Sequence, residues 1–160
     1  MLPVKLITST ATLFFLSILF SQKLYTQNDS LLINSCSFYD SLETHFQCDN
    51  RGYPLSYGKK FCLKFLDKRG QFSEDGQQWI DSTMLCLMKH LNNLDPDLSC
   101  KALRKEAFAS HIPCYIDNGY CNLSKEDRKL VYKIAIPSSV FHPRVWNQGI
   151  KVLQRCREEK

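Results

Sequence analysis

The sequence lacks the short motifs that mark the common secreted hydrolases. It contains no G-x-S-x-G and no H-E-x-x-H, so neither a nucleophile elbow nor a zinc-protease helix is indicated. A secreted phospholipase would need adjacent cysteines and a helical His-Asp pair, and neither His90 nor His111 has that setting. We therefore expect both histidines at a helix end or on the surface, and we assign no catalytic residue.

Metal-ligand spacing is also missing. The eight cysteines form no C-x-x-C pair and the four histidines are scattered, which argues against zinc. The segment from Asp95 to Glu106 has the ligand spacing of a calcium-binding EF-hand loop, but Cys100 stands where that loop needs glycine. An ordinary helix start, with Asp97 as the N-cap after Pro96, explains the same residues. We expect no metal and no cofactor.

Long apolar runs are scarce. The first follows Lys5 and covers residues 6–20, which is too short for a membrane span of about 20 residues and typical of a signal peptide. We expect a leader over residues 1–27, cleaved between about 21 and 27; an uncleaved signal anchor is the alternative. No second run approaches this length, so the protein should be secreted and extracellular, without membrane insertion.

A strong excess of charge of one sign is absent as well. The formal net charge is +5, and Lys5 and Lys23 belong to the leader. The balance argues against nucleic acid as a partner. One local basic run is compatible with heparin-like polymers, but the solvated side of a helix explains it more simply; it comprises Lys59, Lys60, Lys64, Lys68 and Arg69.

Cysteine is the residue that the sequence has in abundance. An even number of cysteines after a secretory leader predicts a disulfide framework. The eight are Cys36, Cys48, Cys62, Cys86, Cys100, Cys114, Cys121 and Cys156. Two sequons, at Asn28 and Asn122, are candidate glycosylation sites.

Strand-type alternation over five or more residues is absent, whereas helical spacing recurs. Residues 28–56 contain turn formers and predict an irregular, cysteine-anchored N-terminal arm, and residues 57–160 predict a helical domain. Phe61 and Phe65 begin a helix that stops at Gly70, and Ser73 is a natural N-cap for the next. The fold class is therefore all-α, a disulfide-stapled bundle of about five helices.

The remaining three helices follow from caps and prolines. One opens at Pro96 and Asp97 and runs towards Ser110. Ser124 caps another, with Asp127 in the acidic position of a capping box. Pro143 suits the first turn of the last. Apolar spacing predicts that Trp79 lies in the core. It also predicts that the inward-facing residues of the last helix are Val145, Trp146, Ile150, Val152 and Leu153.

Cys114 and Cys121 flank an obvious turn, 117–119, and two pairings are open. A bond between them would close a short loop and restrict little chain entropy. Outward pairing, Cys114 back to an earlier helix and Cys121 forward to the last, would clamp the bundle. The preference is mild, because eight cysteines allow 105 connectivities.

Several stretches resemble the stanniocalcins, which are secreted, disulfide-rich glycoprotein hormones. The resemblance covers about a hundred residues, from Tyr57 to Cys156, and rests on the last six cysteines and the text between them. The similar stretches are "KKFCLKFL", "SEDGQQWIDSTMLCLMKHL", "CYIDNGYC" and "VFHPRVWNQGIKVLQRC". The interval from Cys48 to Cys62 is longer than in that family, one N-terminal cysteine pair is missing, and the sequons do not occupy the usual glycan position.

The resemblance implies a pairing and a function. Carried over, the pairs are Cys36–Cys62, Cys48–Cys100, Cys86–Cys114 and Cys121–Cys156. The implied function is non-enzymatic and hormone-like, through an extracellular protein receptor or protease, in calcium and phosphate homeostasis or in inhibition of pappalysin metalloproteinases. The alternatives are a secreted hydrolase of phospholipase type and a structural or host-interaction protein on the same scaffold.

The resemblance also bears on assembly. The cysteine that links two chains in the stanniocalcins lies beyond the last helical one, and here the sequence stops at Lys160. No cysteine is left over for a partner, so we expect no interchain disulfide and a monomer or a non-covalent dimer. A face such as that bearing Phe61 and Phe65 is a candidate for sharing between chains.

Overall fold

The structure is a computed structural model that describes residues 36–135 and 143–158, with backbone only for 143–146. Within these residues it is all-α and contains no strand. The helices are α2 (Phe38–Phe46), α3 (Lys60–Lys68), α4 (Glu74–Asn92), α5 (Cys100–Asp117), α6 (Lys125–Ala135) and α7 (Pro143–Glu158). A π-helical turn, Pro54–Lys59, leads into α3, and short 3-10 turns cover Arg69–Gln71 and Tyr120–Asn122.

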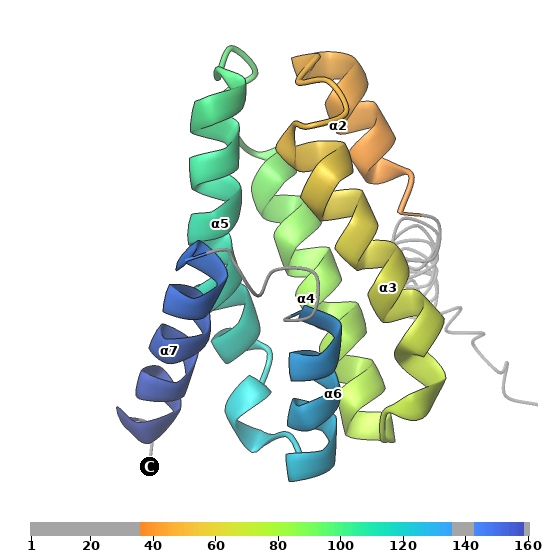
Figure 1. Cartoon of the computed structure of the whole chain (residues 1–160), viewed down its shortest axis with the longest axis vertical. Coiled ribbons are helices and arrows are strands. Elements are labelled where there is room, and N and C mark those ends of the chain that lie inside the picture. Colours follow the sequence, from red (N-terminus) through yellow and green to blue (C-terminus); the bar gives the residue numbers. More distant parts are fainter. Residues whose placement is uncertain (1–35, 136–142, 159–160) are drawn as a thin grey trace, which may run out of the picture.

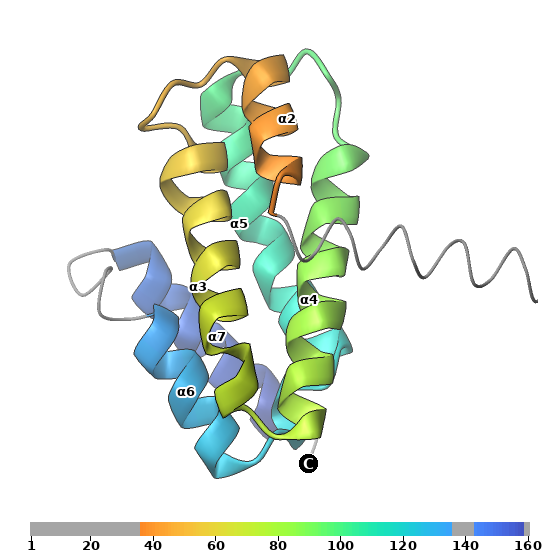
Figure 2. The ribbon, with the colours of Figure 1, turned by 90° about the vertical axis from the view of Figure 1, so that its right-hand side faces the viewer.

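The three helices α3, α4 and α5 run side by side along the long axis of the bundle (Figure 1). The shorter α2 lies between α3 and α4 at one end, while α6 and α7 lie at the other end (Figure 2). There α6 packs against α3 and α7 packs against α5. None of the helices in the described ranges combines the length and hydrophobicity that a transmembrane segment requires.

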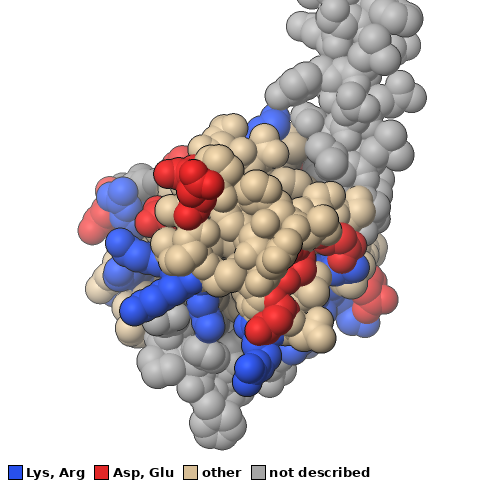
Figure 3. Space-filling view, turned by 90° about the horizontal axis from the view of Figure 1, so that it is seen from above, with Lys and Arg blue, Asp and Glu red and all other residues tan. Residues whose placement is uncertain are grey.

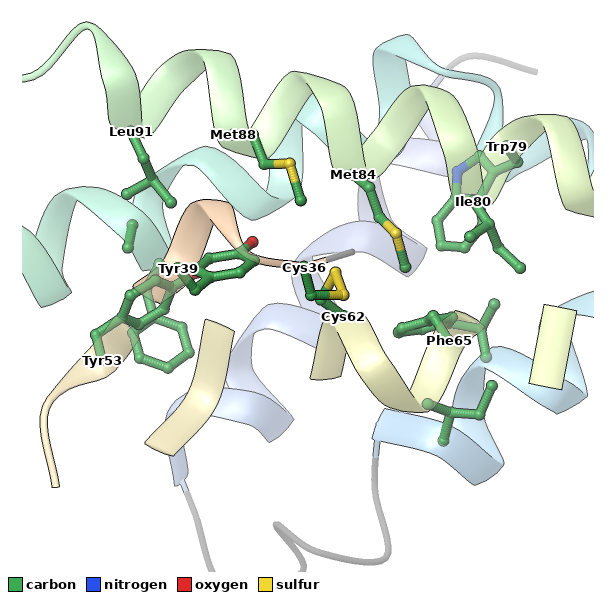
Figure 4. Close-up of a cluster of buried hydrophobic side chains, with 14 of the residues drawn as sticks. Cys36, Tyr39, Tyr53, Cys62, Phe65, Trp79, Ile80, Met84, Met88 and Leu91 are labelled. Carbon is green, nitrogen blue, oxygen red and sulfur yellow. A yellow bond between two sulfur atoms is a disulfide. The ribbon is translucent and has the colours of Figure 1, made fainter. Parts of the chain in front are cut away.

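The core lies between these helices and is rich in aromatic and sulfur-containing side chains. Figure 4 shows Tyr39 of α2 beneath Met84 and Met88 of α4, beside the Cys36–Cys62 disulfide. Trp79, only 3% exposed, is buried as its helical spacing predicted. Its indole N–H donates to the carbonyl of Tyr115 at 3.2 Å, so α4 and α5 are joined by a polar contact within the apolar core.

Two predicted N-caps are present as expected. The Ser73 hydroxyl accepts from the N–H of Gly76 at the start of α4. The Ser124 hydroxyl accepts from the N–H of Asp127 at the start of α6. In both cases the cap satisfies a helix N–H that has no partner within the helix.

The start of α5 differs from its prediction. Its N-cap is Ser99, whose hydroxyl accepts from Ala102 N–H at 3.3 Å, and not Asp97. The Asp95 carboxylate instead accepts from the Asp97 N–H at 2.9 Å, which forms a turn before the helix. Two capping residues compete within three positions, and Asp95 draws Asp97 into the turn.

The end of α5 also differs. The helix does not stop near Ser110 but passes through Pro113 to Asp117. Proline removes the hydrogen bond to the carbonyl four residues earlier, here that of Ala109. Both Ala109 and Pro113 are exposed, so water can satisfy that carbonyl. Cys114 is consequently a helical residue rather than part of a turn.

The N-terminal arm is more regular than expected, because α2 occupies residues 38–46 within it. Tyr39 and Leu42 enter the core, and Phe38 and Phe46 pack against it. These four positions have the spacing of one helix face. The turn formers that follow at 49–52 favour an irregular segment, which is why the sequence did not predict a helix here.

Candidate functional site

Four disulfides fix the helices relative to one another. The pairs are Cys36–Cys62, Cys48–Cys100, Cys86–Cys114 and Cys121–Cys156. They are the same four pairs that the stanniocalcin resemblance implies, and no cysteine of the chain is free. Cys114 joins α5 to α4, whereas Cys121 joins the turn after α5 to the end of α7. The two cysteines of the turn region therefore leave in different directions.

Helix α7 carries two of the three large apolar side chains that are exposed on the described surface. Ile150 is 51% exposed and Leu153 is 40% exposed, and the prediction that both point inward is wrong. Val152 and Cys156 are buried and form the inner stripe, since α7 lies at the edge of the bundle and packs chiefly against α5. One side of α7 therefore presents apolar atoms to solvent. The side chains of Val145 and Trp146 lie outside the described residues.

Basic side chains surround this apolar pair. Lys151, Arg155 and Arg157 are all exposed on α7. The Arg155 guanidinium lies 3.5 Å from the Glu158 carboxylate, with both side chains about two-thirds exposed, so that pair is weak. The exposed face of α7 thus combines two apolar side chains with net positive charge.

The basic run at 59–69 differs from the basic side chains of α7, because carboxylates pair with part of it. Three of its members pair with carboxylates: Lys59 with Asp40 at 2.7 Å, Lys68 with Asp67 at 3.0 Å, and Arg69 with Asp81 at 2.6 Å. These contacts favour the solvated-face interpretation. At the end of the bundle seen in Figure 3, acidic and basic side chains surround a largely uncharged surface. Neither sign of charge predominates on the described surface there.

His111 is buried, at 6% exposure, so its prediction as a helix-end or surface residue is wrong. It lies in α5 amid aromatic rings, stacked on Phe108 and edge-on to Tyr57. Its Nδ1 lies 2.7 Å from the carbonyl oxygen of Ala107. Burial lowers the pKa of His111 to about 4 despite the backbone hydrogen bonds that favour the charged form. His90, by contrast, is in the last turn of α4, as expected.

Ser110 and His111 are neighbours on α5, but their side chains do not form a hydrogen-bonded pair with each other. Ser110 Oγ donates to the same Ala107 carbonyl at 2.8 Å. The two side chains share an acceptor and do not bond each other. Within the described part of the chain, no group of three His, Cys, Asp or Glu side chains has the arrangement of a metal site.

Asp127 was predicted only as the acidic member of a capping box, but it joins two helix N-termini. Its carboxylate accepts from the Ser73 N–H at 3.0 Å, from the Ser73 hydroxyl at 2.6 Å and from the Ser124 hydroxyl at 2.8 Å. Burial alone raises the pKa of the carboxyl, but these hydrogen bonds outweigh it and the pKa is lowered. The long-range contact to Ser73 has no local signal in the sequence.

Of the two candidate glycosylation sites, one lies within the described residues. Asn122 is exposed in the turn before α6, where a glycan would meet solvent, and Asn28 lies outside the described residues.

The two phenylalanines of α3 face the interior of the bundle. Phe65 is buried and Phe61 packs against the core. Both phenylalanines therefore contribute to packing within the bundle.

Comparisons with known proteins identify the family of the chain. Residues 26–160 match the family model described as the Stanniocalcin family. Stanniocalcin-2 of Macaca nemestrina is 22% identical over 126 residues, which cover 78% of this chain and 40% of the relative. The chain thus spans about two fifths of the length of that curated relative. No solved structure matches the chain. The chain belongs to the stanniocalcin family.

Proposed function

We propose that this protein is a secreted, non-enzymatic, hormone-like regulator that acts by binding an extracellular or cell-surface protein. Family membership supports the class. The proposed mature chain begins after a leader of residues 1–27, with an arm over 28–56 and a helical domain over 57–160. Calcium and phosphate homeostasis and inhibition of a metalloproteinase are the specific roles that the family suggests, and both remain proposals for this chain.

The observation that carries the binding proposal is the exposed apolar pair on α7. Ile150 and Leu153 lie one turn apart, among Lys151, Arg155 and Arg157. Apolar side chains at the centre of a patch with a charged rim are typical of protein interfaces. The Cys121–Cys156 disulfide holds the end of α7, which reduces the entropy lost on binding. The basic rim favours a partner with an acidic surface.

The experiment is a cross-linked capture from extracellular fluid, followed by affinity measurement with the purified partner. Ile150→Asp/Leu153→Asp should weaken binding by about thirtyfold or more, since buried interface anchors contribute about 2 kcal/mol or more. Leu63→Asp is the matched control, because Leu63 is 47% exposed but lies on α3. Equal affinity for all three proteins would exclude α7 as the binding face.

A secreted hydrolase remains the alternative class, and no constellation among the described residues supports it. Esterase, lipase and protease assays on the purified protein separate the two. Turnover that one point mutation abolishes would overturn the binding proposal. Absence of turnover together with partner capture would support it.

A further inference from the structure

A hollow with a volume of about 160 Å³ lies between α5, α6 and α7. Its walls are largely carbon and include Ile112, Val131, Ala135 and Val152. Ile150 and Leu153 also line it and are partly exposed, so the hollow opens towards the surface beside α7. Gly149 lies on the same wall, and a Cβ built there meets no atom within 4 Å.

The inner end of the hollow is polar but uncharged. It is formed by Tyr57, His111 and Tyr115, which also line a smaller cavity of about 40 Å³ on the core side. No Asp, Glu, Lys or Arg is among the described residues that line the hollow. Burial raises the pKa of Tyr57 to about 12 and keeps His111 neutral at pH 7. Such a lining excludes ions, because a charge there would lose its hydration without a counter-charge.

The hydrogen bonding of His111 determines what kind of polar group fits. A carbonyl oxygen only accepts, so the 2.7 Å contact to Ala107 requires the proton on Nδ1. Nε2 then carries a lone pair and accepts. His111 lines the hollow, so a ligand there that carries a donor can hydrogen-bond to this nitrogen.

The volume sets the size of that ligand. An engineered apolar cavity of about 150 Å³ in another protein stays dry and binds benzene, so one aromatic ring fits a hollow of about 160 Å³. We propose that the hollow between α5, α6 and α7 binds a small neutral phenol, with its ring between the helices and its hydroxyl donating to Nε2 of His111. The rim of this ligand site shares Ile150 and Leu153 with the protein-binding face proposed above.

The test titrates the disulfide-intact protein with p-cresol and toluene, which differ in the hydroxyl, and with p-hydroxybenzoate, which adds a charge. Ligand-observed NMR and calorimetry should show saturable binding of p-cresol and no binding of p-hydroxybenzoate. His111→Phe keeps a ring but removes the acceptor. It should weaken p-cresol by about tenfold and leave toluene unchanged.

A second variant tests the location without touching the histidine. Gly149→Leu places a side chain in the hollow and should abolish binding of both p-cresol and toluene. Gly70→Leu is its matched control, because Gly70 is also open around its Cβ but lines neither cavity. Near-ultraviolet circular dichroism verifies that each variant is folded. Absence of saturable p-cresol binding, or equal binding by parent and Gly149→Leu, would overturn the proposal.

Discussion

Gly76 of α4 and Asp127 of α6 approach so closely that a Cβ on Gly76 would lie 2.8 Å from the Asp127 carboxyl carbon. The carboxylate cannot move away readily, because it is buried and accepts hydrogen bonds from Ser73 and Ser124. The glycine is thus required by a contact with a helix that lies fifty residues further along the chain.

Gly76→Ala should destabilise the protein by about 1–3 kcal/mol, the usual cost of overpacking, although alanine favours helices by about 1 kcal/mol. Chemical denaturation measures the change. Gly149→Ala in α7 is the matched control, since its Cβ has open space, and it should leave stability unchanged or slightly raised. Equal stability of the two variants would show that Asp127 yields to the added methyl group.

Acid should destabilise the protein in two steps. The folded pKa of His111 is about 4, below its unfolded value near 6.5, so the unfolded chain binds more protons between these values. His111 therefore contributes stability that is present above pH 6.5 and lost as the pH falls towards 4, about 2 kcal/mol of it by pH 5. The contribution of Asp127, whose pKa is lowered, is lost only at lower pH, as the carboxyl protonates.

Denaturation curves at pH 7.5 and pH 5 measure the first step. His111→Phe lacks the titrating group, so its stability should change less than that of the parent over this interval. The same slope in both proteins would assign the pH dependence to other groups.

Peptide mapping without reduction should find Cys86 linked to Cys114 and Cys121 linked to Cys156. A peptide joining Cys114 to Cys121 would contradict this pairing. Each bridge contributes about 2–4 kcal/mol. Cys86→Ser should therefore lower secretion strongly, and more than Cys86→Ala/Cys114→Ala, because the single variant also leaves Cys114 free for wrong pairs.

A glycan on Asn122 should be removed by PNGase F from protein made in a eukaryotic secretory pathway. Asn122→Gln should lack the mobility shift and keep its stability, whereas Ser124→Ala should lose both the glycan and the α6 cap, at about 1 kcal/mol. Ser124→Thr preserves the sequon and the capping oxygen and should behave as the parent. Asn28→Gln reports the other sequon in the same assay. An unchanged shift in Asn122→Gln would exclude this site.

The sequence predicted the structure correctly where the contacts that determine it join residues close together in the chain. Ser73 and Ser124 cap their own helices within three residues, and the stripe containing Trp79 faces the core. The all-α class follows from such patterns. Family resemblance, rather than spacing, supplied the disulfide pairs.

The errors occur where a distant element decides. His111 is buried because Tyr53 and Tyr57, more than fifty residues earlier, pack beside it. Ile150 and Leu153 continue an apolar pattern, but no described helix covers that side of α7. The contact between Asp127 and Ser73 depends on how α4 and α6 meet. Helical periodicity identifies the apolar side of a helix, but it does not show how much of that side is covered by other helices.

The order of the four bridges along the chain determines what a single backbone cut can separate. The loops closed by Cys36–Cys62, Cys48–Cys100 and Cys86–Cys114 overlap in series, and the Cys121–Cys156 loop begins after they end. A protease that cuts between residues 36 and 114, or between 121 and 156, therefore leaves one covalent molecule. A cut in the short stretch from 115 to 120 leaves two fragments with no bond between them, and α6 and α7 would then stay with the rest only through packing.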